Sequence, residues 1–173
     1  GDGVSEFVFL LLVGICIGFI YIVHKYFSKS EFYLLGIIYT IISFLMSFKL
    51  INIFGMDVNP SIIFTSGIFI VIYYFINRYD VKEYKKFILL IFSTSIVCNL
   101  FLLSTSFMIP SIYDNSSNLY QSLILDNLVI FILYPVSILV TSCLSGYCFR
   151  GLKEENKKNI KNIIAIIGIM FIY

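Results

Sequence analysis

The chain has 173 residues, of which 60% are hydrophobic and only 13% are charged, and its mean hydropathy is +0.97. Because a soluble domain carries about a quarter charged residues, this composition excludes a soluble globular enzyme, and its wealth of aromatic residues excludes intrinsic disorder. The net charge of +2 comes from short clusters between apolar runs, so we expect no nucleic-acid partner. We predict an all-α integral membrane protein, with residues 1–173 forming a single polytopic domain in contact with the lipid bilayer.

Apolar stretches of about 20 residues predict membrane-spanning helices, because that length crosses the hydrocarbon core of a bilayer. Long runs without alternation favour helices over the strands of a barrel. Five full spans and the beginning of a sixth are readable, at 4–24, 32–54, 61–77, 86–110, 121–149 and, in part, 162–173. Since the sequence opens without Met and stops at Tyr173 inside an apolar run, we expect a C-terminally truncated chain.

Basic residues gather in alternate loops. Eleven of the 12 lysine and arginine residues lie in segments 24–31, 78–86 and 150–161, and the twelfth is Lys49. The positive-inside rule places these three loops in the cytoplasm and the N-terminus outside. The composition, rich in Ile, Phe, Asn and Lys, is typical of a bacterial AT-rich genome, which predicts the inner membrane as location. Residues 55–60 and 110–119 are expected to be outer loops.

Polar side chains inside apolar spans are the informative ones, because burying them in lipid is costly. Asp126 and Asn127 either bind a solute or a coupling proton, or lie near enough to the outer surface to stay hydrated. Lys49 either reaches the membrane interface or pairs with Asp126 across helices. Asn99 either bonds a neighbouring helix or faces a solute cavity.

Small and hydroxyl side chains predict close helix packing. A stripe on one face of the fifth span, around Pro135, serves either packing or a transport path, and it consists of Tyr134, Ser137, Thr141 and Ser145. Gly14 and Gly18 form a G-x-x-x-G motif that lets a helix, a second copy or a partner subunit approach closely. His24 has no carboxylate pair or metal-ligand spacing around it, so we expect no enzyme activity, cofactor or metal.

The order of features resembles the queuosine-precursor transporters, also labelled putative vitamin uptake transporters, over roughly residues 4–165. Four segments are similar to that family's pattern: KYFSKSEFY (25–33), KLINIFG (49–55), YDVKEYKKF (79–87) and FRGLK (149–153). The resemblance implies a compact bundle of about six helices that imports a 7-deazaguanine-type precursor. Lys49 carries over, whereas Tyr73 and Asn77 stand where the family tends to have acidic residues.

A planar heteroaromatic solute needs aromatic faces for stacking and amide or carboxyl groups that read its edge. On this chemistry Tyr73, Tyr74 and Tyr134 are candidates for the face, and Asn77, Asn99 and Asp126 for the edge, with Lys49 and Asn127 completing the predicted site. Two alternatives remain open. The chain can be the substrate-binding membrane subunit of an energy-coupling-factor importer, or a non-transporting scaffold whose buried polar residues only join helices.

Overall fold

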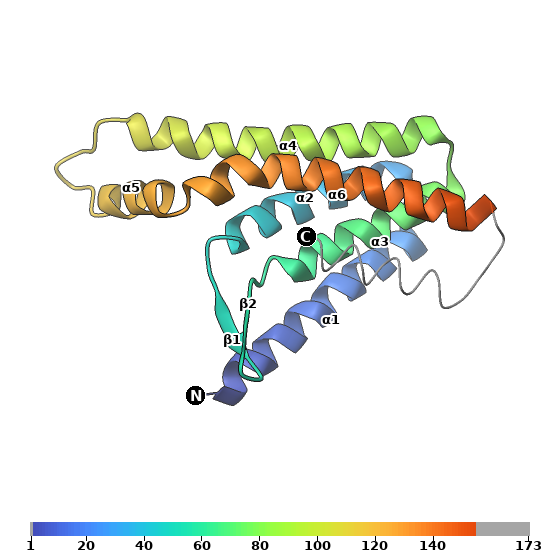
Figure 1. Ribbon diagram of the computed structural model, residues 1–173, viewed down its shortest axis with the longest axis horizontal. Coiled ribbons are helices and arrows are strands. Elements are labelled where there is room, and N and C mark those ends of the chain that lie inside the picture. The colour runs from blue at the N-terminus through green and yellow to red at the C-terminus, as the bar shows by residue number, and fades with distance from the viewer. Residues whose placement is uncertain (1, 155–173) are drawn as a thin grey trace.

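The computed structural model describes residues 2–154, and its regular structure is almost entirely helical (Figure 1). Four helices are long and apolar enough to cross a membrane: α1 (Asp2–Tyr26), α2 (Lys29–Met46), α4 (Val81–Phe107) and the greater part of α6 (Leu128–Glu154). The α3 helix (Ile62–Arg78) is apolar but has only 17 residues. The all-α, multi-pass membrane class is therefore confirmed, while five full spans stay a prediction. The partial span 162–173 lies outside the described residues.

The predicted second span is too long. The α2 helix ends at Met46, and residues that the sequence assigned to its end form a hairpin of β1 (Ile51–Ile53) and β2 (Met56–Val58). Phe54 and Gly55 make its turn with φ values of 52° and 78°, the left-handed pair that a two-residue hairpin turn requires. The Glu6 carboxylate accepts a hydrogen bond from the Phe54 N–H at 3.1 Å, which ties the start of α1 to the hairpin.

The predicted fifth span is two helices. A short helix, α5 (Ser117–Asp126), is separated from α6 at Asn127, whose backbone leaves the helical region with φ −123° and ψ 27°. The Asn127 side chain donates to the Leu123 carbonyl at 3.0 Å and so satisfies one acceptor at the end of α5. Pro135 lies inside α6, as the sequence predicts.

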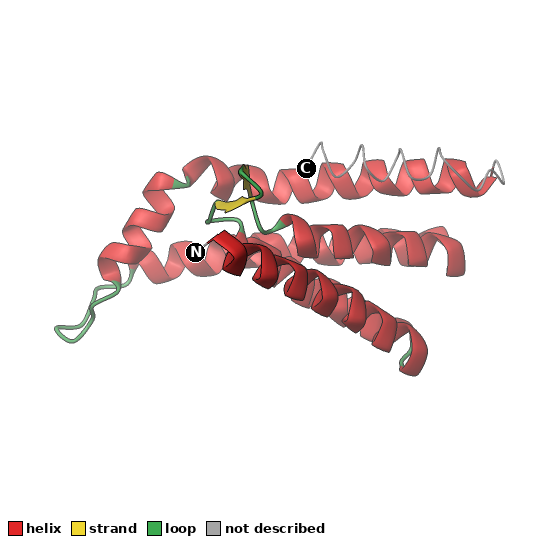
Figure 2. Cartoon of the chain, turned by 90° about the horizontal axis from the view of Figure 1, so that it is seen from below, coloured by secondary structure: helices red, strands yellow, loops and turns green. Residues whose placement is uncertain are grey.

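The helices run between two ends of the molecule (Figures 1 and 2). One end carries the N-terminus of α1, the hairpin, the 108–116 loop and α5. The other carries the α1–α2 turn, the α3–α4 turn and the C-terminal end of α6. We call the latter the basic end, because it holds the basic residues of segments 24–31 and 78–86 together with Arg150.

Glycines set the closest helix contacts, but not the glycines of the G-x-x-x-G motif. A Cβ atom on Gly36 of α2 would lie 2.2 Å from the Phe87 ring of α4, and one on Gly67 of α3 would lie 2.6 Å from Cys16 Sγ. Phe87 is fully buried and stacks on Phe75 with ring centroids 4.9 Å apart, so it has no room to move. By contrast, a Cβ on Gly14 would meet no atom within 4 Å.

We expect Gly36→Ala to destabilise the protein by about 1–3 kcal/mol, because the added methyl group overpacks the α2–α4 contact. Gly14→Ala is the matched control, since the same methyl group enters open space. Thermal unfolding of both variants in one detergent measures the difference. Equal midpoints for the two variants would contradict the tight α2–α4 contact.

Candidate functional site

The closest contact of α1 with α2 and α3 is at Cys16. The Tyr39 hydroxyl donates to the Cys16 carbonyl at 2.6 Å, and the Cys16 thiol lies 3.6 Å from the Ile63 carbonyl as a weak donor. Gly67 provides the space for this contact. Figure 2 shows α1, which begins at the label N, running at an angle to the other helices. Its second half consequently leaves a cleft beside α3 that α2 closes near the basic end.

This cleft has a volume of about 390 Å³ and a largely apolar lining. It brings together three of the sequence-predicted site residues, Tyr73, Tyr74 and Asn77, all from the last turns of α3. They share the cleft with residues that sequence reasoning did not assign to a site: Ile17, Ile20, Tyr21, His24, Phe32, Ile70 and Arg78. The volume lies within the usual range of small-molecule sites.

Aromatic rings form the walls of the cleft. Tyr74 stacks on the fully buried Phe32 with centroids 4.1 Å apart and an interplanar angle of 26°. His24 of α1 contacts the Tyr74 ring edge-on at 5.4 Å. Tyr73 is 42% exposed and meets Phe149 of α6 edge-on at 5.2 Å. Phe32 and Phe149 thereby fix two tyrosine rings, of which Tyr73 is the exposed one and can stack on a planar ligand.

Two polar side chains remain at the rim. The Asn77 Nδ2 group donates to the Tyr73 carbonyl at 3.1 Å. Its Oδ1 atom accepts no hydrogen bond from residues 2–154 and can accept one from a ligand. The Arg78 guanidinium lies over the Tyr74 ring at 5.8 Å from the centroid. Because Arg78 forms no ion pair within residues 2–154, its N–H donors stay available to a ligand.

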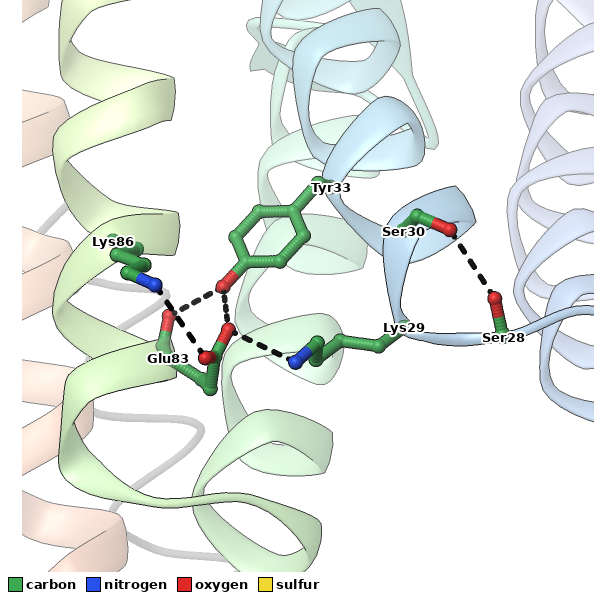
Figure 3. Close-up of polar contacts among 6 residues, drawn as sticks. All are labelled: Ser28, Lys29, Ser30, Tyr33, Glu83 and Lys86. Atoms are coloured by element: carbon green, nitrogen blue, oxygen red, sulfur yellow. Dashed lines mark hydrogen bonds and ion pairs between the residues drawn. The ribbon is translucent and has the colours of Figure 1, made fainter.

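A cluster around Glu83 stands beside the cleft at the basic end (Figure 3). Glu83 on α4 pairs with Lys29 of α2 at 3.4 Å and with Lys86 one turn along at 3.6 Å, and it accepts a hydrogen bond from the Tyr33 hydroxyl. Lys29 also lies 5.5 Å from the centroid of the Tyr79 ring. These bonds tie the beginnings of α2 and α4 together and engage the Glu83 carboxylate within the protein.

Asn99 joins two helices at the place where a backbone bond is missing. Pro135 has no N–H, so the Phe131 carbonyl, four residues earlier in α6, loses its helical donor. The Asn99 amide on α4 donates to this carbonyl at 2.6 Å. Its buried Oδ1 atom has no hydrogen-bond partner among the described residues. Asn99 thus takes a helix-joining position, away from the cleft.

The remaining predicted site residues lie elsewhere. Tyr134 is buried and donates to the Thr40 carbonyl of α2 at 2.9 Å. Asp126 accepts from Ser122 at 2.8 Å at the exposed end of α5, and Lys49 is exposed between α2 and β1. Within residues 2–154 the predicted Lys49–Asp126 ion pair does not form, because the broken fifth span leaves Asp126 in α5 and the early end of α2 leaves Lys49 in a loop.

The hydroxyl groups of the α6 stripe donate hydrogen bonds to carbonyls of the same helix. Thr141 donates to the Ser137 carbonyl and Ser145 to the Thr141 carbonyl, both at 2.6 Å. The close contact on this face comes from Gly146, which the sequence did not single out: a Cβ atom there would lie 1.6 Å from the Tyr84 hydroxyl of α4. That hydroxyl donates to the Ser142 carbonyl at 3.3 Å.

No protein-family model, curated protein or solved structure matches this chain.

We expect Asn99→Ala to destabilise the protein by about 1 kcal/mol, since it leaves the Phe131 carbonyl without a donor. The same substitution in a Pro135→Ala background should have little effect, because the restored N–H of residue 135 bonds that carbonyl. A double-mutant cycle of unfolding in detergent measures the coupling. Additive effects of the two substitutions would show that Asn99 does not replace the bond lost at Pro135.

Proposed function

We propose that this chain is a multi-pass transporter of a bacterial inner membrane that imports a small planar heteroaromatic solute, of the 7-deazaguanine type found in queuosine precursors. The observation that carries the proposal is the cleft between α1, α2 and α3. Its walls present the Tyr73 and Tyr74 rings, and its rim presents the free acceptor of Asn77. Stacking surface and an edge-reading amide are what such a solute requires.

The basic end is proposed to face the cytoplasm, with five crossings in the described chain. The Lys29–Glu83 ion pair places the turns before α2 and before α4 at the same end. The chain therefore travels out along α2 and returns along α3, which supports α3 as a crossing despite its 17 residues. At 1.5 Å per residue α3 is about 26 Å long, close to the hydrocarbon thickness of ~30 Å.

A second candidate function is the substrate-binding membrane subunit of an energy-coupling-factor importer. The observation that favours it is the open face of α1, where Cβ atoms on Gly14 and Gly18 would meet nothing within 4 Å. Such a subunit binds the same solute in the same cleft but needs a transmembrane partner and ATPases for uptake. Binding by the isolated protein without uptake in cells that lack those partners would favour this candidate.

We expect the chain to restore queuosine in the tRNA of a bacterium that lacks both queuosine synthesis and precursor uptake. Tyr73→Leu should lower the initial rate of precursor uptake about tenfold, because it removes the exposed aromatic ring on which the solute stacks. Tyr147→Leu is the matched control, since Tyr147 is 81% exposed on α6 and lies outside the cleft lining. No queuosine from the inserted, folded wild-type protein would favour a non-transporting scaffold.

Orientation is tested by cysteines placed at Ser116 and at Lys82, each labelled in intact cells with a membrane-impermeant maleimide. We expect Ser116→Cys to react from outside and Lys82→Cys only after the cells are opened, because basic loops stay in the cytoplasm. The unsubstituted chain measures the background from its four native cysteines. Labelling of both sites from outside would refute α4 as a crossing, since α4 alone separates them. Labelling of Lys82→Cys and not of Ser116→Cys from outside would overturn the proposed orientation.

A further inference from the structure

We infer that the solute carries a negative charge, a carboxylate on its planar ring system, and that Arg78 binds this group at the rim of the cleft. The inference rests on the proposed function and narrows its substrate class. Its starting point is the charge of the cleft. Arg78 and His24 are the basic residues that line the cleft, and no Asp or Glu of residues 2–154 lines it. A cationic solute would therefore meet only repulsion or no charge there.

Within residues 2–154 Arg78 forms no ion pair with a carboxylate, and neither do Lys25, Lys82, Lys85 and Arg150 at the same end, but of these five only Arg78 lines the cleft. Lys29 and Lys86 are both paired with Glu83, the acidic residue of the neighbouring cluster. Asp80 precedes α4, does not line the cleft and forms no ion pair with Arg78. Within residues 2–154, the contact of the guanidinium is the face of Tyr74.

The contact with Tyr74 positions the Arg78 guanidinium to bind an anion. Tyr74 is itself fixed by its stack on the buried Phe32, so the guanidinium rests on a rigid ring. The fork of N–H donors matches a carboxylate in a two-bond geometry, which lysine does not offer. At the boundary of the hydrocarbon the effective dielectric constant is lower than in water, and the attraction is correspondingly stronger.

Three kinds of side chain contact three different parts of the solute in the proposed site. The exposed Tyr73 ring receives the plane of the solute, the Asn77 Oδ1 atom accepts from a ring N–H, and Arg78, resting on Tyr74, holds the carboxylate. Asn77 and Arg78 are consecutive at the end of α3, one helical turn after Tyr73 and Tyr74. One helix end therefore carries the contacts to all three parts of the ligand.

The test measures binding to the full chain in nanodiscs of zwitterionic phosphatidylcholine. The probes are three 7-deazaguanines that differ only in the group at position 7: carboxylate, carboxamide and aminomethyl. We expect the carboxylate to bind about tenfold more tightly than the carboxamide, and the aminomethyl compound to bind more weakly than either. Arg78→Gln should abolish the difference between carboxylate and carboxamide, and Arg78→Lys should restore part of it.

Arg150→Gln is the matched control, because Arg150 is an exposed arginine at the same end of the bundle but does not line the cleft. If Arg150→Gln lowers carboxylate binding as much as Arg78→Gln does, the preference comes from the net charge of the basic end, and the assignment to Arg78 is wrong. If the carboxylate and the carboxamide bind the wild-type protein equally, the inference that the solute is negatively charged is wrong, while the proposed function stands. If none of the three compounds binds, the proposed function itself fails.

The phosphate group of an anionic lipid is another anion that can reach Arg78. A second experiment distinguishes binding of this lipid from binding of the solute. The measurements are repeated in nanodiscs containing phosphatidylglycerol. If Arg78→Gln changes only the thermal stability gained from anionic lipid, and leaves the binding of all three compounds unchanged, Arg78 is a lipid contact and the inference is overturned. If the wild-type protein prefers the carboxylate over the carboxamide equally in both kinds of nanodisc, the inference is supported.

Discussion

Every backbone N–H and C=O group in the apolar part of this chain needs a partner within the protein, because lipid supplies none. Regular helices meet this demand over most of the chain, and the irregular places show how it is met elsewhere. At Pro135 a side chain from another helix, Asn99, reaches the freed carbonyl. At the end of α5 the Asn127 side chain reaches back to Leu123. Asn99 and Asn127 are polar residues of the predicted spans that the fold uses for this purpose.

The same constraint explains how the cleft arises. Helices can approach closely only where side chains are small, and α1 meets its neighbours tightly at the Cys16–Gly67 contact. The Tyr39 hydroxyl bonds the Cys16 carbonyl there, so the crossing point is fixed by a polar bond as well as by packing. Because straight helices that cross at an angle diverge away from the crossing, space opens toward the basic end. Aromatic side chains from α2 and α3 line that space without filling it.

The fold class was predictable from the sequence, whereas some boundaries were not. Composition and apolar run length determine that the chain spans a membrane several times, since lipid admits few alternatives. The segment from Lys49 to Phe54 reads as a continuation of an apolar helix, because a short apolar run has no periodicity that separates strand from helix. The Phe54–Gly55 turn was the available signal for a hairpin. The break at Asn127 shows only as one asparagine after an aspartate.

Tertiary contacts were the least predictable part. A G-x-x-x-G motif marks where close packing is allowed, but Gly14 is open while the isolated Gly36 and Gly67 are filled by Phe87, Cys16 and Tyr39. Which glycine makes a close helix contact depends on which side chain of another helix packs against it. The sequence of one helix does not contain that information.

The sequence-predicted site residues separate according to whether the fold already uses their polar groups. Asn99 gives its amide to Phe131, and Tyr134 gives its hydroxyl to Thr40, so each would have to break a bond within the bundle to read a solute. Tyr73 and Tyr74 present their rings to a cleft, and Asn77 keeps its carbonyl oxygen free of bonds to the described residues. In an apolar medium a bond already made is hard to exchange, because the group left behind goes unsatisfied. The groups still able to bind a solute at low cost are therefore those at the end of α3, where the proposed site lies.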